Sequence, residues 1–351
     1  SPDIVTKKEL LSIVNLVYNL NINIIDKETE KKCYRSLSSL YDLKKYAIQT
    51  IEEQIKELYN FEKTIDNFSK IVDLRTEFGN ELVLGIPYAY WLYERGELEK
   101  VVTSKGMKPF YYFCDNVEEK YTSRTVNNEV SGVMNLPNPW IHGNSRMGTT
   151  HTKPGQLNYD KWLVPDYKKH YSEKVPILIK PTIFISHKYN IEHGHEPLGF
   201  FGIKCLYDMF EHLTDVGYEV IYKRPKNTEG FTLDENEINT LNNNLTLTAD
   251  VEGVGVIDDY QLVKYFDGVY LIEDLISEMG YDVTSPHEYN IGQLKILSNV
   301  CGSITSGGGN SILSSYFGKI HIMYNVSETE HKDGYFGKNS YMNKLSDVEL
   351  F

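Results

Sequence analysis

The sequence contains little of what marks several specialised classes of protein. It has only four cysteines in 351 residues, and no two of them form a CxxC pair. Cys33, Cys114, Cys205 and Cys301 are scattered along the chain, which excludes a cysteine-based zinc site and fits a reducing compartment best. No run of about 18 consecutive apolar residues occurs, so the sequence predicts no transmembrane segment.

Positive charge is also in short supply. Lysine and arginine number 36 against 49 aspartates and glutamates, which gives a net charge of −13 at pH 7. This balance argues against a general nucleic-acid-binding protein, although a local basic pocket for one anionic ligand is compatible with it. Hydrophobic residues make up 41% and charged residues 24%, as in soluble globular proteins. The first residues show no signal-peptide pattern, and we therefore expect a cytoplasmic protein.

Several common catalytic motifs are absent as well. The sequence contains no GxSxG, no Walker lysine motif and no GxGxxG, which disfavours hydrolases, P-loop NTPases and dinucleotide-dependent dehydrogenases. It also lacks HExxH, although the run from His187 to His195 contains three histidines and Glu192. No second cluster of aspartate, cysteine or histidine completes a metal site around this run, so we expect a ligand-binding loop there, with no metal site and no cofactor.

The most informative stretch runs from Val300 to Tyr324. It can be read as a strand, a glycine turn, a helix from Ile312 to Phe317 with Asn310 or Ser311 as its N-cap, and another strand. A glycine turn brings backbone close to a ligand, and unpaired N–H groups at a helix start favour phosphate. The alternative is a plain loop between strand and helix. The predicted diphosphate site consists of Ser306, Gly307, Gly308, Gly309, Asn310 and Ser311.

The second half of the chain alternates between strand and helix patterns. Alternation of this kind predicts parallel βαβ units and a Rossmann-like domain. His187 and Lys188 follow one predicted strand, and Lys223 and Arg224 follow the next, so we expect all four at the edge that holds the glycine turn. The predicted elements are Thr182–Ser186, Ile203–Val216, Glu219–Tyr222, Gly253–Ile257, Asp259–Phe266, Val269–Ile272 and Ile291–Asn299.

The middle of the chain suggests another α/β domain. Glu81 to Ile86 reads as a buried first strand leading into Pro87 and Tyr88, and Pro109 to Cys114 reads as a second strand ending at Asp115. Between Asn127 and Tyr159 lies a polar loop, and loops of this length are usually functional or mobile. That loop contains Trp140, His142, Arg146 and His151.

The N-terminal part, from Thr6 to Leu74, has a helical pattern and is almost free of glycine and proline. We expect a helical hairpin that packs against the rest of the chain, with a homodimer seam as the alternative. The predicted domains are therefore a helical hairpin over 1–76, an α/β domain over 77–175, a second α/β domain over 176–325 and a tail over 326–351.

From the helix at Ile291 to the strand ending at Tyr324, the chain resembles the donor-diphosphate segment of GT-B nucleotide-sugar glycosyltransferases. Lys188, Lys223 and Arg224 are similar to the cations that many members set against the donor phosphates. The resemblance implies two Rossmann-like domains facing across a cleft, with the nucleotide sugar as co-substrate in the second. It also implies a metal-independent transfer to a glycan or other hydroxyl acceptor. No E-x7-E pattern supports a retaining subfamily, so we expect inversion.

The same resemblance assigns the acceptor to the first α/β domain. The candidates for the general base are Asp115, His142 and His151, since a base within about 3 Å must take the acceptor's proton. The candidate acceptor contacts are Pro87, Tyr88, Trp140 and Arg146. A surface role for the two histidines stays open. The other functional classes that remain are a sugar-nucleotide epimerase of similar architecture and a non-catalytic glycan-binding protein.

Overall fold

The computed structural model describes 70–124, 129–130, 164–176, 178–192, 196–225, 241–242, 245–324 and 345–350. The chain divides into two units, 1–68 and 69–351, and every described element belongs to the second. Most of the expected helical hairpin and of the C-terminal tail therefore lies outside the described residues. At the end of the predicted hairpin, Ile71–Arg75 is strand β1, and its buried Val72 and Leu74 alternate with half-buried neighbours. The helical expectation is wrong there because the pattern has already changed to the two-residue period of a strand.

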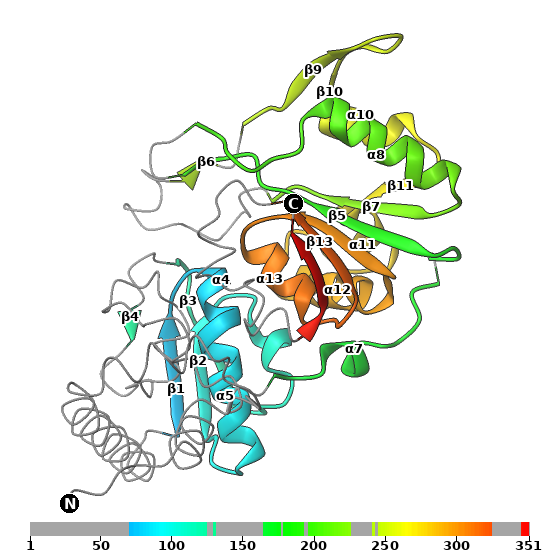
Figure 1. Ribbon diagram of the computed structural model, residues 1–351. Helices are drawn as coiled ribbons and strands as arrows, with labels where there is room; N and C mark the ends of the chain where they lie inside the picture. The colour runs from blue at the N-terminus through cyan, green and yellow to red at the C-terminus, as the bar shows by residue number, and fades with distance from the viewer. Residues whose placement is uncertain are drawn as a thin grey trace, which may run out of the picture. The chain divides into compact units, whose positions relative to one another are not determined.

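The first sheet has the strand order β3-β2-β1-β4. Strands β1, β2 (Lys100–Ser104) and β3 (Val117–Tyr121) pair in parallel, and the short β4 (Glu129–Val130) pairs antiparallel with β1. The connection from β1 to β2 is one helical segment, formed by α4 (Phe78–Asn80), the π-helical turn η1 (Glu81–Gly85) and α5 (Ile86–Glu94). Figure 1 shows this segment beside β1 and β2.

Two predicted strands of this region are wrong. Glu81 to Ile86 is helical, and Pro109 to Cys114 begins in a 3₁₀ helix, η2 (Lys108–Tyr111). Short apolar runs do not distinguish a buried strand from a buried helix, and here the residues are buried on consecutive turns of a helix. Pro109 favours a helix start because its fixed φ suits the first turn.

The second sheet has the order β11-β7-β5-β12-β13-β14, and all of its neighbouring strands are parallel. The two sheets confirm an α/β fold of Rossmann-like type. The predicted strands of the second half are confirmed with small changes of boundary. Their bounds are β5 Thr182–Ser186, β7 Glu219–Lys223, β11 Val269–Leu271, β12 Gly302–Ser306 and β13 Ile320–Tyr324. The sixth strand, β14 (Asp347–Leu350), was not predicted; it lies within the expected tail and pairs with β13.

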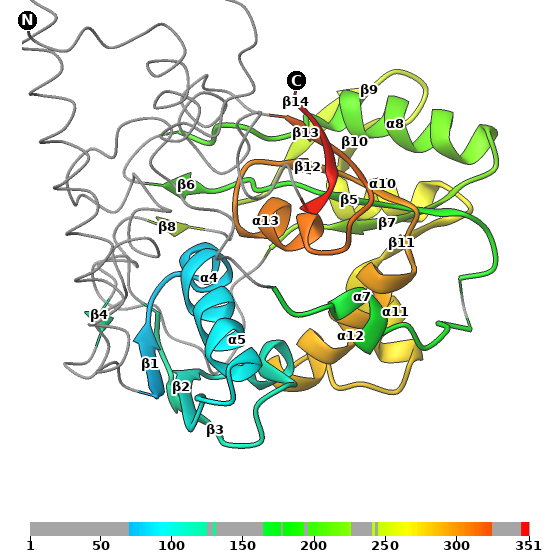
Figure 2. The ribbon, with the colours of Figure 1, turned by 60° about the horizontal axis from the view of Figure 1, so that its bottom comes forward.

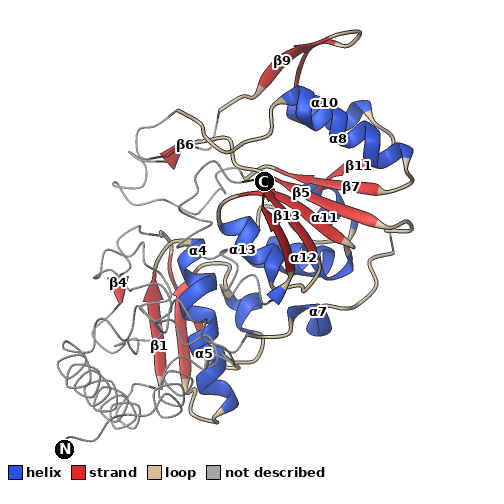
Figure 3. Cartoon of the chain, viewed as in Figure 1, coloured by secondary structure: helices blue, strands red, loops and turns tan. Residues whose placement is uncertain are grey.

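Helices cover both faces of this sheet, as Figures 2 and 3 show. On one face, α8 (Ile203–Asp215) and α10 (Asp259–Tyr265) bury Leu206, Phe210 and Leu262 against β5 and β7. On the other lie α11 (Ile272–Glu278), α12 (Pro286–Asn299) and α13 (Gly309–Ser315). This arrangement is the doubly wound form expected of right-handed crossovers.

Some elements depart from the expected pattern. The strand expected at Gly253–Ile257 is β10 (Gly255–Asp258), and it pairs antiparallel with β9 (Thr248–Val251) outside the main sheet. A second small pair joins β6 (Ile191–Glu192) to β8 (Leu241–Asn242), and α7 (Tyr167–His170) precedes β5. Among the described helices, none has the length and apolar character needed to span a bilayer.

Candidate anion-binding site

The order in which the chain adds strands to the second sheet reverses at β5. The chain passes from β5 to β7 on one side, and it returns later to place β12 on the other side of β5. In open α/β sheets, ligands bind beyond the carboxyl ends of the strands at such a switch point. Ser186, Lys223 and Ser306 end these three strands and therefore lie at one edge. The structure thus confirms that the predicted basic residues and the glycine turn share an edge.

The glycine turn differs in detail from the prediction. Helix α13 begins at Gly309, so its N-cap is Gly308 and neither Asn310 nor Ser311. Gly308 has φ 141°, a conformation that favours glycine. Ser311 closes the turn, because its Oγ donates to the Gly308 carbonyl at 2.6 Å and accepts from the Gly308 N–H at 3.1 Å. Within the described residues, the N–H groups of Gly309 and Asn310 have no acceptor.

The third glycine of the turn has a packing role. A Cβ atom at Gly309 would lie 2.8 Å from Phe78 Cδ1 and 3.6 Å from the backbone nitrogen of Gly79. Nearby, the Tyr316 hydroxyl donates to the carbonyl of Leu82. Helix α13 therefore packs closely on the α4–η1 segment of the first sheet, and Gly309 is the residue that permits this approach.

This packing leads to a first prediction. Replacing Gly309 with alanine should lower the free energy of unfolding by about 1 to 3 kcal/mol, because the new methyl group overlaps the Phe78 ring. The control is Gly202→Ala at the N-cap of α8, where no atom lies within 4 Å of the added Cβ. Urea unfolding of both variants checks the prediction. Equal midpoints for Gly309→Ala and the wild type would contradict it.

Lys223 is the buried cation of this edge. The residue is 7% exposed, and its Nζ donates to Gln293 Oε1 and, at 3.2 Å, to Asn310 Oδ1. Nζ also lies 5.2 Å from the centre of the Tyr289 ring. Burial lowers the pKa of Lys223 to about 8, although nearby Glu273 opposes this shift. Among the described residues, no carboxylate forms an ion pair with this ammonium group, so its charge is solvated only by amide oxygens and a ring.

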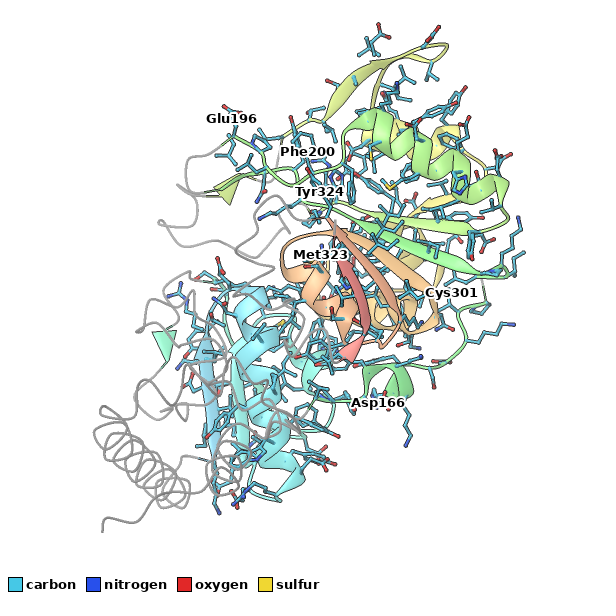
Figure 4. The ribbon with its side chains drawn as sticks, viewed as in Figure 1. Asp166, Glu196, Phe200, Cys301, Met323 and Tyr324 are labelled. Carbon is cyan, nitrogen blue, oxygen red and sulfur yellow. The ribbon has the colours of Figure 1, made fainter. Side chains whose placement is uncertain are left out.

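Other predicted donor-site residues surround the same point. The Asn310 amide donates to Ser186 Oγ at 3.0 Å, and the Lys188 backbone N–H donates to Ser306 Oγ at 3.1 Å. The alkyl part of the Lys188 side chain passes Gly308, since a Cβ there would lie 3.8 Å from Lys188 Cδ. The structure therefore brings Lys188, Lys223, Asn310 and the glycine turn together. Figure 4 shows Tyr324 at the end of β13 on this edge, with Cys301 before β12 toward the opposite edge.

Arg224 belongs to a different cluster. Arg224 is 5% exposed, and its guanidinium donates to Asp259 from Nε at 2.6 Å and to the carbonyl of Leu245 at 2.8 Å. None of its hydrogen bonds goes to the glycine turn. The expectation that its charge projects toward the turn is therefore not met, because Asp259 already neutralises that charge in a buried ion pair.

His187 belongs to the same cluster. Its Nδ1 accepts from the Phe201 N–H at 3.1 Å, so its Nε2 carries the proton that reaches the Tyr222 hydroxyl at 2.6 Å. The Tyr222 hydroxyl in turn donates to Asp259 Oδ2 at 2.7 Å. Burial, and secondarily Arg224, lowers the pKa of His187 to about 3, so the ring is neutral. This neutral ring packs against Phe201 and Tyr222 and does not offer a charge to a ligand.

Of the acceptor-side candidates, the structure describes Pro87, Tyr88 and Asp115, and it does not bring these three to this edge. Asp115 is exposed and precedes β3, so it lies at the amino edge of the first sheet and does not follow a buried strand as predicted. Pro87 and Tyr88 are buried inside α5, in place of the expected loop after a strand. Trp140, His142, Arg146 and His151 lie outside the described residues, as do His193 and His195.

Sequence reasoning missed the partners of the buried cations. Gln293 and Tyr289 contact Lys223 from α12, and Asp259 pairs with Arg224 from the start of α10. A glutamine in an amphipathic helix carries no sequence signal for such a contact. The only sequence feature that pointed to the Arg224 pair was Asp259 at the start of a predicted helix. An acidic residue is common at that position in any case, because the helix dipole favours negative charge there.

The described residues contain no group of three or more histidines, cysteines, aspartates or glutamates placed to hold a metal ion. Comparisons with protein-family models, curated proteins and solved structures give no match to this chain.

Proposed function

We propose that the protein is a glycosyltransferase that binds a nucleoside-diphosphate sugar at the carboxyl edge of the second sheet and transfers the sugar to a hydroxyl acceptor. The observation that carries the proposal is Lys223, a buried ammonium group without a carboxylate partner among the described residues, beside a glycine turn at a switch point. A buried charge is costly unless it is paired, and a diphosphate would supply the missing partner.

The charges of this edge suit a diphosphate. Lys223 and Lys188 contribute two cations, and the N–H groups of Gly309 and Asn310 add donors at the same turn. A sugar linked to a nucleoside diphosphate leaves as an anion, and cations fixed beside it stabilise the charge that develops. In this proposal Lys223 and Lys188 contact the phosphates, while Arg224 and His187 hold the end of β7 and β5 in place.

The acceptor side depends on residues of the first α/β region. We propose that His142 or His151 accepts the proton of the acceptor hydroxyl, because imidazole has a pKa near neutrality, and that Trp140 and Arg146 contact the acceptor. Asp115 becomes the weaker candidate, since it lies at the amino edge of its sheet. Turnover of His142→Ala and His151→Ala, measured separately, decides between the two histidines.

The test of the proposed reaction is the release of nucleoside diphosphate from nucleotide sugars, with and without hydroxyl acceptors. A glycosyltransferase should release nucleotide faster when its acceptor is present. Release without any effect of acceptors favours an epimerase-like enzyme. Binding of glycans without nucleotide binding favours a non-catalytic glycan-binding protein, and either result would contradict the proposal.

The pKa of Lys223 predicts how nucleotide affinity depends on pH. With a pKa of about 8, this lysine is charged below pH 8 and loses its proton above it. An anion binds the charged form, so affinity should be constant from pH 6.5 to 7.5 and then fall by about tenfold per pH unit above the pKa. Calorimetric titration of a nucleotide sugar from pH 6.5 to 9.5 measures this dependence. The Lys223→Arg variant should show no decline, since arginine stays charged throughout the range.

A further inference from the structure

Two amide side chains of α12 connect a turn of the first sheet with Lys223. The Asn290 amide nitrogen donates to the carbonyl of Gly106 at 2.8 Å, in the turn that follows β2. Asn290 Oδ1 accepts from Gln293 Nε2 at 3.3 Å, three residues further along the same face of the helix. Gln293 Oε1 then accepts from Lys223 Nζ. The hydrogen bonds form an unbroken series from the first sheet to the buried ammonium group.

Each amide in this series can have only one orientation. A backbone carbonyl can only accept, so Gly106 fixes the amide nitrogen of Asn290 and leaves its oxygen toward Gln293. That oxygen fixes the amide nitrogen of Gln293 in the same way. The oxygen of Gln293 therefore faces Lys223, whose ammonium group has donors only. A flipped amide anywhere in the series would place two donors or two acceptors against each other.

The first member of the series is held firmly. Gly106 has φ 87°, and a Cβ atom there would lie 2.6 Å from the Cβ of Pro286, the first residue of α12. The Gly106 turn therefore rests directly on the start of the helix that carries Asn290 and Gln293. On the far side of Lys223, Asn310 presents its oxygen for a similar reason, because its amide nitrogen donates to Ser186 Oγ.

We propose that Asn290 and Gln293 are positioning residues, which use the Gly106 carbonyl as an anchor to hold the Lys223 ammonium group in place for the ligand's diphosphate. The choice of ligand rests on the proposed function. The arrangement of the series itself is independent of it, since every contact in it lies within the protein.

Among the described residues, few other groups face Lys223. Tyr289 of α12 places its ring 5.2 Å from Nζ, and its hydroxyl donates to Glu273 of α11 at 3.4 Å. Glu273 raises the pKa of Lys223, while burial lowers it more strongly. Arg224 follows Lys223 in the chain, and Asp259 neutralises it. Loss of the Gln293 oxygen should therefore lower the pKa of Lys223 further, and a carboxylate in its place should raise it.

The test is a pH titration of Lys223 in the unliganded full-length protein, by NMR of protein labelled with ¹³C and ¹⁵N in lysine. The Lys223→Met variant identifies its resonance. Gln293→Leu should lower the titration midpoint by about one pH unit, and Gln293→Glu should raise it by about 1 to 3 units. Asn290→Ala should lower it, because Gln293 loses its fixed orientation. The matched control is Asn299→Ala, since Asn299 also lies on α12 and donates to a backbone carbonyl outside the helix.

Opposite shifts for the two Gln293 variants, with no shift for Asn299→Ala, support the proposal. An unchanged midpoint in folded Gln293→Glu and Asn290→Ala overturns it, whether or not Gln293→Leu folds. Nucleotide titration of the same variants separates this inference from the proposed function. Unchanged midpoints with nucleotide bound by the wild type overturn the positioning role alone. The expected shifts without any nucleotide binding overturn the proposed function and, with it, the diphosphate as the ligand.

Discussion

Replacing Asp259 with asparagine should lower the free energy of unfolding by about 3 to 5 kcal/mol, the scale found when one partner of a buried ion pair is removed. Asp259 is fully buried and accepts hydrogen bonds from Arg224 at 2.6 and 3.1 Å and from the Tyr222 hydroxyl at 2.7 Å. Asparagine has the same shape as aspartate but no charge. Its amide NH₂ group would also face one of the groups that now donate to Asp259, either the Arg224 guanidinium or the Tyr222 hydroxyl. The Arg224 guanidinium, whose pKa is too high for it to become neutral, then stays charged without compensation.

Urea unfolding of Asp259→Asn measures this loss. The control is Glu173→Gln, which removes the carboxylate of an ion pair with Lys295 in which the Glu173 side chain is 73% exposed. Exposed pairs contribute little because water and salt screen them, so the control should unfold close to the wild type. A loss in Asp259→Asn as small as that of the control would contradict the structural role assigned to this cluster.

Replacing Lys223 with methionine should weaken nucleotide affinity by about 10- to 100-fold, the value of a hydrogen bond to a charged group. Methionine has a similar length and fills the same buried space without the ammonium group. The Gln293 and Asn310 oxygens that Lys223 contacts then face an apolar atom, and a diphosphate at this edge loses its buried cation. Calorimetric titration of a nucleotide sugar at pH 7 measures the change.

Lys319 provides the matched control for Lys223→Met. Burial lowers its pKa to about 8 as well, but it precedes β13 at the amino edge of the same sheet. Its Nζ donates to the carbonyls of Leu297, Ser298 and Val300 at the end of α12, so it caps a helix. Lys319→Met should reduce stability and leave nucleotide affinity unchanged. Equal losses of affinity in the two variants would argue that Lys223 acts only through stability.

The second sheet was largely predictable because its strands and helices alternate with clear boundaries. Thr182–Ser186 is strand β5 as predicted, and the helix expected at Ile203–Val216 ends one residue earlier. The start of α13 was predicted three residues too late, because Ser311 is a good N-cap by type yet occupies the third helical position. In the first sheet, the apolar run at Glu81–Ile86 is too short for its hydrophobic pattern to show whether it is a buried strand or a buried helix.

The candidate site depends on side-chain directions and distant contacts that the residue pattern does not specify. Lys223 and Arg224 are adjacent and were expected to act together at one edge. Side chains alternate between faces at the end of a strand, so Lys223 turns toward α12 and Arg224 toward α10. Gln293 lies 70 residues from Lys223 in the chain, and only the crossover through α12 brings it to the edge. Such pairings depend on strand order, which the residue pattern alone does not give.

A thermal-shift series measures whether the edge at Lys223 binds a nucleoside diphosphate. The wild type, Lys223→Met and Lys319→Met are heated with UDP, GDP, CMP or dTDP in turn. One nucleoside diphosphate should stabilise the wild type and Lys319→Met by about 2.7 kcal/mol at 100 times its dissociation constant, and it should stabilise Lys223→Met far less. No shift with any nucleotide, or an equal shift in all three proteins, would contradict binding at this edge.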